Sequence, residues 1–344
     1  MRCGVLKFTC AVAVSGAALA LPASADPIAD FYKGRHMDLT ISGSAGGGYD
    51  QYARLLAKHM PRHIPGEPTL TVKNMVGAEG IKAANFLYSI APRDGSMMGG
   101  LQRNAALVRL YDPDNKSVQY NAREFEWIGT PQQEIGIMVI SARKPVKTVE
   151  DLRSVELTVA STARNAPTSV YPRMLNALYG AKFKVIEGYE GSQTGLLAVE
   201  RGEVDGYVSG GSSAALRARY EPWLKAGTAR VIMQMGMTRD PSYPDAPTAI
   251  EAMTTPEAKQ MFQIAFTEQV MGRPFLFPPK VPADRVKAFR DAFDATMKDE
   301  TFLADAKSQK VEIDPVGGEA IAQLLERVYA TPPDVVAKLR DLAK

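Results

Sequence analysis

The stretch Ile41-Ser42-Gly43-Ser44-Ala45-Gly46-Gly47-Gly48-Tyr49-Asp50 joins an extended apolar run to a segment with helical periodicity. Met37, Leu39 and Ile41 alternate along the run, as in a β-strand. The segment that follows repeats apolar side chains at the i, i+3, i+4, i+7 spacing of one helix face, at Tyr49, Tyr52, Ala53, Leu56 and Met60. The sequence therefore predicts a strand, a glycine loop and a helix in direct succession.

The glycine loop, Ser44–Asp50, is suited to bind an anion with its main chain. The first amides of a helix lack carbonyl partners, and the helix dipole gives them a positive potential. Glycine lets the backbone approach a ligand closely and adopt positive φ. Asp50 falls in the first helical turn, where a carboxylate is favoured and can accept bonds from free amides. The alternative is a tight turn without a ligand, although three consecutive glycines exceed what a turn requires.

The same arrangement returns further along the chain. The strand-like segment Thr69–Asn74 leads into a second glycine loop, Met75–Gly80, and then into a helical segment, Ile81–Ile90. Repeated strand–loop–helix units favour parallel sheets, in which ligands lie beyond the carboxyl ends of the strands. A second set of such units runs from Glu156 to Met235, and the final third is mainly helical. These patterns predict an α/β protein with two lobes.

The composition is that of a globular protein long enough for two domains, with 344 residues, 45% hydrophobic and 23% charged. The formal net charge of +3 is too small to indicate a nucleic-acid surface. Neither G-x-G-x-x-G nor G-x-x-x-x-G-K-[ST] fits Gly43–Gln51, so phosphate-rich cofactors are not indicated. We expect no cofactor.

Residues 1–25 have the features of a secretory signal peptide. Arg2 and Lys7 form a charged region ahead of an apolar stretch at 8–21, and Ala23-Ser24-Ala25 is a cleavage site of the A-x-A type. The apolar stretch is shorter than the ~20 residues of a membrane-spanning helix. Cleavage would remove both cysteines of the chain, which suits an oxidising compartment. We therefore expect an exported, soluble protein.

Two kinds of chemistry are disfavoured. Ser42–Gly46 approximates the nucleophile elbow of an α/β-hydrolase, but such an enzyme needs a histidine far downstream, and the histidines are His36, His59 and His63. His59 and His63 have the i, i+4 spacing of a metal-binding pair, yet Pro61 between them prevents a shared helix face. We expect neither catalysis nor a metal site.

Five motifs occur in one order along the chain. They are the first glycine loop with Asp50, the loop at Gly77–Gly80, Gly188-Tyr189-Glu190-Gly191-Ser192, Gly202-Glu203-Val204-Asp205 and Tyr243-Pro244-Asp245-Ala246-Pro247-Thr248. Their order and spacing resemble the periplasmic solute-binding receptors of tripartite tricarboxylate transporters, the Bug or TctC-like family. The resemblance implies an α/β, two-lobed periplasmic binding protein fold of the type II-like kind. Each lobe would be a mainly parallel sheet flanked by helices, and crossover strands would join the lobes.

The resemblance also implies domain bounds. Residues 1–25 would be the signal peptide, 26–132 and 237–344 the first lobe, and 133–236 the second lobe. The chain would cross between the lobes near Gly129–Glu134 and again near Gln234–Thr238.

In that family, backbone amides of the two glycine loops hold the ligand's carboxylate, and a polar loop of the second lobe completes the site. Carried onto this chain, the resemblance implies the ligand-binding residues Ser44, Ala45, Gly46, Gly47, Gly48, Tyr49, Asp50, Gly77, Ala78, Glu79, Gly80, Ser161, Thr162, Arg164, Thr168, Ser169, Tyr189 and Ser209.

Some of these residues depart from the family pattern. Gly43-Ser44 replace a common Phe-Pro pair, and Tyr49 stands where Thr or Ser is usual, so it could supply a ring or a hydroxyl. Glu79 replaces a glycine, and its carboxylate would repel an anion unless it points away or is paired. Arg164 replaces a small polar residue; it either clamps a second carboxylate or lies at the surface in an ion pair.

The implied function is that of a periplasmic receptor. It would bind a small organic carboxylate, a mono-, di- or tricarboxylate, between its lobes and deliver it to the membrane subunits of a tripartite tricarboxylate-type transporter. The alternative is a periplasmic sensing module that uses the same pocket and signals to a membrane partner such as a sensor kinase. In both cases we expect a monomer that binds no nucleic acid and is not an enzyme.

Overall fold

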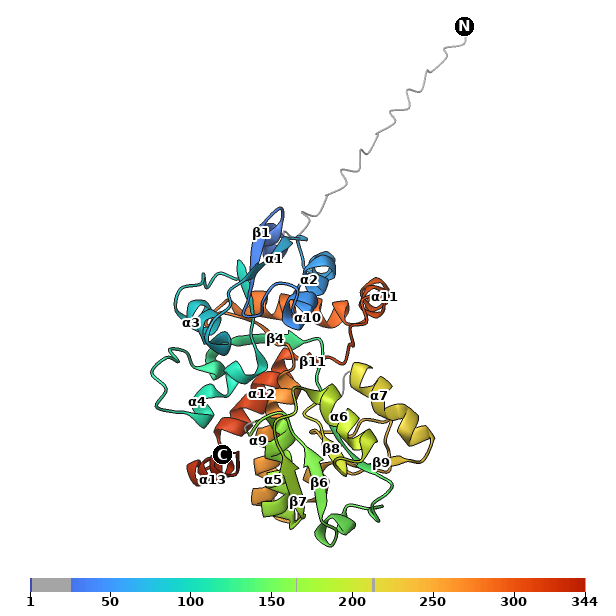
Figure 1. Ribbon diagram of the computed structural model, residues 1–344. Helices are drawn as coiled ribbons and strands as arrows, with labels where there is room; N and C mark the ends of the chain where they lie inside the picture. Colours follow the sequence, from blue (N-terminus) through green and yellow to red (C-terminus); the bar gives the residue numbers. More distant parts are fainter. Residues whose placement is uncertain (2–25, 165, 212–213, 344) are drawn as a thin grey trace.

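The computed structural model describes residues 1, 26–164, 166–211 and 214–343, which form two lobes (Figure 1). The expected signal peptide spans 1–25, so all of it except Met1 lies outside the described residues. Within the described ranges, no helix combines the length and the apolar character needed to cross a membrane.

The first sheet has six strands among the described residues, in the order β11-β4-β10-β3-β1-β2. Their bounds are β1 His36–Ile41, β2 Thr69–Asn74, β3 Met97–Gly100, β4 Glu126–Thr130, β10 Phe275–Phe277 and β11 Val316–Gly317. Strand β1 pairs in parallel with β2 and β3, whereas β10 is antiparallel to β3 and β4, and β11 is antiparallel to β4. Strands β1 to β4 therefore run in one direction, and the two late strands run against them.

The second sheet has the order β7-β6-β8-β5-β9. Its strands are β5 Gly136–Ser141, β6 Leu157–Ala160, β7 Phe183–Ile186, β8 Gly206–Val208 and β9 Ala229–Met235. Strand β6 is parallel to β7 and β8, and β5 is antiparallel to β8 and β9, so β5 alone among these strands runs the opposite way. The predicted fold class, two lobes each with a β-sheet flanked by helices, is confirmed. Both sheets are mixed, because β10 and β11 in the first sheet and β5 in the second run against their neighbours.

Helices cover both sheets (Figure 1). Their bounds are α1 Pro27–Tyr32, α2 Gly48–His59, α3 Ile81–Ser89, α4 Val108–Tyr111, α5 Pro167–Tyr179, α6 Ser192–Arg201, α7 Ala214–Lys225, α8 Ala249–Ala252, α9 Pro256–Met271, α10 Ala283–Thr296, α11 Glu300–Ser308, α12 Gly318–Tyr329 and α13 Pro333–Ala343. The sequence patterns did not predict α7, which contains Pro222. Proline lacks the N–H of an interior helical bond, so it weakens the helical signal there.

Helix α2 forms where the apolar periodicity predicts it. Its N-cap, Gly47, has an extended backbone, and the chain turns into a short 3-10 helix, Met60–His63, at the predicted stop beside Pro61. The apolar face of α2 is buried against the first sheet, with Leu55 and Leu56 at most 2% exposed. Burying each such side chain contributes about 1.5–3 kcal/mol, which is enough to fix this helix on its sheet.

Strand β5 shows why the second sheet is buried on both faces. Its side chains alternate between the two faces, as the pleat of a strand requires. Ile137 and Val139 pack with residues of α6 and α7, while Met138 and Ile140 belong to the core that includes α5 and α9. A continuous apolar run of this kind is therefore a central strand covered on both sides.

Helix α9 packs against elements of both lobes. Phe266 is fully buried and meets Tyr171 of α5 edge to face, with ring centroids 5.3 Å apart. On its other contacts, α9 packs against α12 and α13. Because α9 contacts helices of both lobes, its packing does not assign it to one of them. The predicted bounds, 26–132 with 237–344 for the first lobe and 133–236 for the second, stay a prediction.

Substitution of Gly318 is expected to destabilise the first lobe. A β-carbon there would collide with the carbonyl oxygen of Trp127 in β4, against which α12 packs. We expect Gly318→Ala to lower the free energy of unfolding by about 2–3 kcal/mol, measured by urea denaturation, because the helix must move off the strand. The neighbouring Gly317→Ala is the control, since its β-carbon would meet nothing closer than Asp294 at 3.8 Å. Equal stability of the two variants would contradict this packing.

Candidate functional site

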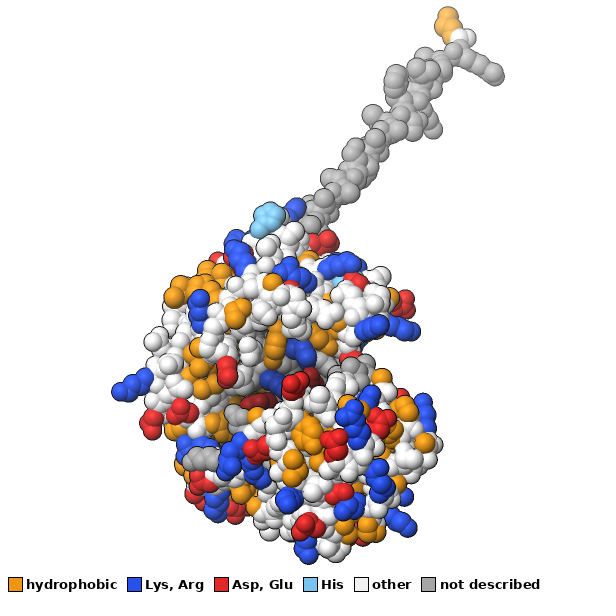
Figure 2. Space-filling model, viewed as in Figure 1, with side chains coloured by type: hydrophobic (Ala, Val, Ile, Leu, Met, Phe, Trp, Pro, Cys, Tyr) orange, Lys and Arg blue, Asp and Glu red, His pale blue; other side chains and the backbone are white. Residues whose placement is uncertain are grey.

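A cavity of about 440 Å³ lies where the two lobes meet. Figure 2 shows the molecule hollowed between its halves, with basic and acidic side chains gathered inside the hollow. The lining residues are Tyr49, Glu79, Gln102, Arg103, Asn104, Glu134, Glu268, Gly272 and Arg273. Most of them lie in the segments that connect β1, β2, β3 and β4 to the next element, so the cavity lies at the carboxyl ends of these parallel strands, where such folds bind ligands.

Two arginines share one carboxylate inside this cavity. Arg103 Nη1 donates to Glu134 Oε2 at 2.6 Å, and Arg273 Nη1 lies 3.3 Å from Glu134 Oε1. Burial raises the pKa of Glu134, but the charges of Arg103 and Arg273 outweigh burial and leave that pKa below its usual value. Glu134 is therefore ionised at neutral pH and holds both guanidinium groups.

Arg273 is held from several sides. Its Nη1 also donates to the side-chain oxygen of Gln132, and its guanidinium lies over the ring of Tyr52, 4.7 Å from the centroid. The Tyr52 hydroxyl donates to the same Gln132 oxygen at 2.8 Å. Cation–π contact and shared hydrogen bonds thus fix the orientation of one guanidinium of the cavity.

Tyr49 lines the cavity and forms hydrogen bonds to two of the segments around it. Its hydroxyl accepts a bond from the Arg103 amide at 3.1 Å and lies 3.4 Å from the carbonyl oxygen of Gly272, to which it donates. Burial raises the pKa of Tyr49, so the hydroxyl keeps its proton. The Tyr49 hydroxyl therefore connects the start of α2 to two other loops. Whether its ring or its hydroxyl contributes to ligand binding stays a prediction.

Asp50 closes the first glycine loop from within. Its side chain is 4% exposed and accepts bonds from the Gly46 amide and from Asn74, both at 2.9 Å, and from Arg54 at 2.8 Å. The bond from Arg54 chiefly lowers the pKa of Asp50 to about 2, against burial and with help from Gly46 and Asn74. Asp50 is therefore a structural anion at the base of this loop.

The rest of the loop is open to solvent. Ser44, Ala45, Gly46 and Gly48 are exposed, and the Gly47 amide bonds back to the Ser44 carbonyl at 3.1 Å. Among the described residues, the amides of Gly48 and Tyr49 have no hydrogen-bond partner, as the first turn of a helix leaves them. These two amides, one in an exposed residue and one in a partly buried residue, are the donors of the predicted main-chain anion site that have no protein partner among the described residues.

The second glycine loop has a left-handed backbone. Its last four residues have positive φ, with values of 150° for Gly77, 46° for Ala78, 50° for Glu79 and 94° for Gly80. Such a conformation costs a non-glycine residue about 1–2 kcal/mol, and strain of this kind concentrates at functional sites. It directs Glu79 into the lining of the cavity, where Asn104 donates to its carboxylate at 3.4 Å.

Glu268 is the least expected member of the cavity. It lies in the last turn of α9, where the helix dipole disfavours a negative charge. Burial raises the pKa of Glu268; the nearby Arg103 lowers it, and the carboxylate of Glu79 raises it further.

The polar residues predicted for the second lobe form a buried hydroxyl cluster. Ser161 and Ser169 are 0% exposed and Thr168 is 6% exposed. Ser161 Oγ lies 2.8 Å from Thr168 Oγ1 and 2.6 Å from Ser169 Oγ, and the Thr162 amide donates to Thr168 at 3.2 Å. This cluster fixes the start of α5, and its role in ligand binding stays a prediction.

The remaining predicted residues lie around that cluster. The Tyr189 amide donates to the Ser161 carbonyl at 3.1 Å, and buried Ser209 accepts a bond from the Ile137 amide at 2.8 Å. Arg164 is exposed before α5, and its carbonyl accepts a bond from Arg173. None of these side chains is among the described residues that line the cavity, so their ligand contacts also stay predictions.

Sequence reasoning missed seven lining residues: Gln102, Arg103, Asn104, Glu134, Glu268, Gly272 and Arg273. The first four follow β3 and β4, so the rule that placed ligands at the ends of β1 and β2 could have found them. Glu268, Gly272 and Arg273 come from the end of α9, and no local pattern brings them to this edge of the sheet.

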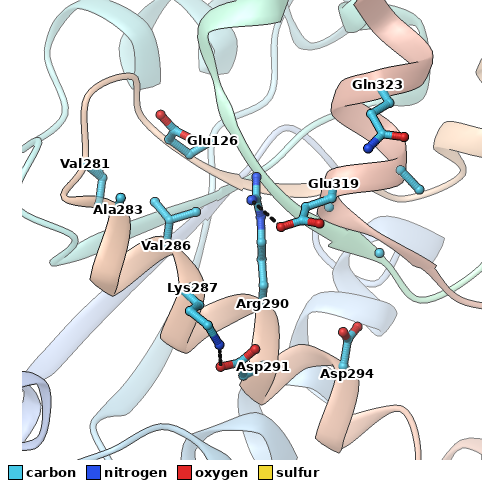
Figure 3. Close-up of a pocket in the computed structure, with 13 residues that line it drawn as sticks. Glu126, Val281, Ala283, Val286, Lys287, Arg290, Asp291, Asp294, Glu319 and Gln323 are labelled. Atoms are coloured by element: carbon cyan, nitrogen blue, oxygen red, sulfur yellow. Dashed lines mark hydrogen bonds and ion pairs between the residues drawn. The ribbon is translucent and has the colours of Figure 1, made fainter.

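A larger cavity, of about 740 Å³, lies between α10 and α12. Two ion pairs lie in this cavity and are drawn as dashed lines in Figure 3: Arg290 lies 3.6 Å from Glu319, and Lys287 lies 2.6 Å from Asp291. Most of the lining residues come from α10 and α12 rather than from strand ends. The pairs include the exposed side chains of Lys287, Asp291 and Glu319, as is typical of a solvated surface. We therefore assign the ligand site to the smaller cavity.

Within the described residues, no group of three or more His, Cys, Asp or Glu side chains could hold a metal ion.

Solved structures share this fold, although no family model and no curated protein matches the sequence. A TctC solute-binding protein from Polaromonas, solved without ligand, has a TM-score of 0.67 at 18% identity, covering 90% of this chain and 98% of its own. The periplasmic binding protein BugD has a TM-score of 0.50 at 18% identity, over 90% and 98% of the two chains. Rpa4515 of R. palustris, solved with adipate, has a TM-score of 0.50 at 18% identity, covering 89% of this chain and 97% of its own.

These likenesses define the class of structure: the chain has the two-lobed fold of periplasmic solute-binding proteins. The resemblance to TctC and Bug receptors that the motifs predicted is confirmed as a likeness of fold.

Asp50 predicts a pH dependence of stability. Its pKa is about 2 in the folded protein against an ordinary 3.8, so the unfolded chain binds the proton more readily. The stabilisation by ionised Asp50 is complete above pH 3.8 and is lost as the pH falls toward 2. We expect the difference in unfolding free energy between the wild type and Asp50→Asn to shrink over that interval, measured by urea denaturation at each pH. Asp245→Asn is the control, because it removes an exposed surface carboxylate. If the difference in unfolding free energy between the wild type and Asp50→Asn does not change with pH, Asp50 does not have the lowered pKa.

Proposed function

We propose that this protein is a periplasmic receptor that binds a small organic carboxylate in the cavity between its lobes. It delivers the ligand, unchanged, to the membrane subunits of a tripartite tricarboxylate-type transporter. The observation that carries the proposal is the convergence of Arg103 and Arg273 on a single carboxylate, that of Glu134, at the carboxyl ends of the strands. The fold supports it, since the solved proteins of this fold include solute-binding proteins, one of them with adipate.

The two guanidinium groups supply what a carboxylate ligand needs. Arginine presents a planar fork of donors that matches a carboxylate, and partial burial strengthens each charged hydrogen bond. Arg103 and Arg273 have side chains that are 31% and 20% exposed, so both remain open to the cavity. The amides of Gly48 and Tyr49, which have no hydrogen-bond partner among the described residues, add main-chain donors beside Tyr49 of the lining.

Glu134 links the site to movement of the lobes. It lies on the crossover between β4 and β5, and its amide donates to the carbonyl of Gln269 in α9 at 3.0 Å. A ligand carboxylate that shares or replaces the bonds of Glu134 acts directly on this crossover. Ligand then shifts the open–closed equilibrium by contacting both lobes in the closed form, where the Ser161–Ser169 loop approaches it.

Loss of Arg103 is expected to weaken binding. A thermal-shift screen of mono-, di- and tricarboxylates first identifies a ligand, because a compound that binds only the native state raises the melting temperature. Calorimetric titration of Arg103→Gln with that compound should show a loss of about 1.5–3 kcal/mol, the worth of a charged hydrogen bond. Arg123→Gln is the control, since Arg123 pairs with Glu326 away from the cavity. Equal affinity of wild type and Arg103→Gln would exclude this site.

Ligand is expected to close the lobes. Small-angle X-ray scattering at saturating ligand should give a smaller radius of gyration than the ligand-free protein, because the hollow between the lobes narrows. Arg103→Gln at the same ligand concentration should retain the larger radius. A radius that does not change at saturation would contradict closure, whatever the affinity.

A further inference from the structure

The cavity contains more acidic than basic side chains. Its charged residues are two arginines, Arg103 and Arg273, and three carboxylates, Glu79, Glu134 and Glu268. Glu134 pairs with both arginines. Among the described residues, neither Glu79 nor Glu268 has an ion-pair partner, and Asn104 is the hydrogen-bond partner of Glu79. The cavity therefore has one end where Glu134 is paired with both arginines and another where Glu79 and Glu268 form no ion pair, with Arg103 as the cation nearest to Glu268.

Glu268 lies at a position that opposes a negative charge, and Glu79 is the carboxylate that faces it in the lining. Glu268 lies at the negative end of the α9 dipole, and burial and Glu79 both favour its neutral form. Glu79 is directed into the cavity by a left-handed backbone that a glutamate adopts only with strain. A ligand whose only charges are carboxylates would add a further anion to this end. A cationic group there would instead relieve the repulsion between the two side chains.

We propose that the ligand of this cavity is an amino carboxylate, with its carboxylate at Arg103 and Arg273 and its ammonium group between Glu79 and Glu268. The inference rests on the proposed function and narrows its ligand class. An ammonium group has three donors and no acceptor, so it can bond both carboxylates at once. The two arginines would thus bind the carboxylate end, and the two carboxylates the ammonium end, of one small zwitterionic molecule.

The experiment compares carboxylates with and without an amine. The matched pairs are butanoate with 4-aminobutanoate, glutarate with glutamate, and adipate with 2-aminoadipate, each titrated calorimetrically into the protein. In at least one pair, the aminated member should bind about tenfold to a hundredfold more tightly, as one charge-assisted hydrogen bond in a partly buried site provides.

Two variants connect that preference to the proposed residues. Glu268→Gln and Glu79→Gln should each reduce the preference to less than about threefold, since the glutamine amide keeps the shape and removes the charge. If Glu268→Gln in α9 lowers the melting temperature, Glu79→Gln still tests the proposal, because Glu79 is exposed and its substitution should not affect folding. Glu319→Gln, whose side chain is 78% exposed and lies outside the cavity, is the control and should retain the full preference.

The outcomes separate the two proposals. Tight binding of an amine-free member, with no gain from the amine in any pair, would overturn the amino carboxylate assignment and leave the carboxylate receptor standing. A preference that persists in both glutamine variants would also overturn the assignment. Binding of no member of any pair would overturn the receptor function together with the inference.

Discussion

The pairing of Arg103 and Arg273 with Glu134 is the interaction on which the rest of the site depends. Its members come from the loop after β3, the crossover after β4 and the chain after α9, which are distant in sequence. Removing such charges from water costs several kcal/mol for each ion, so the groups are stable there only with good partners. The bonds to Gln132 and the contact with Tyr52 complete that pairing. Through it, the shape of the cavity is coupled to the segment that joins the lobes.

The fold was largely predictable because its elements have strong local patterns. The alternation in His36–Ile41 and the helical face of Gly48–His59 each reflect burial on one side of a single element. The site was less predictable. Glu268 and Arg273 enter it through the insertion of β10 between β3 and β4, a long-range pairing that leaves no local periodicity. Sequence reasoning reached the loops after β1 and β2, but not the side chains that supply most of the charge.

The predicted polar residues show a second reason why site predictions fail. A loop dense in hydroxyl groups, such as Ser161–Ser169, has the composition of a ligand-binding loop. Its hydroxyl groups also satisfy one another at the start of α5, which needs no ligand. Asp50 is similar: its carboxylate binds the Gly46 amide of its own loop. Composition identifies where polar groups gather, whereas burial and partners decide whether they are free to bind.

The position of β10 has a consequence for the order in which the chain can fold. Strands β5 to β9 are contiguous in sequence, so the second sheet can assemble from its own segment. The first sheet remains split until Phe275–Phe277 inserts between β3 and β4, and contacts of such long range form slowly. A nascent chain that lacks its last quarter would therefore hold one finished half and one with two open strand edges. Those edges are where unwanted pairing between chains would begin.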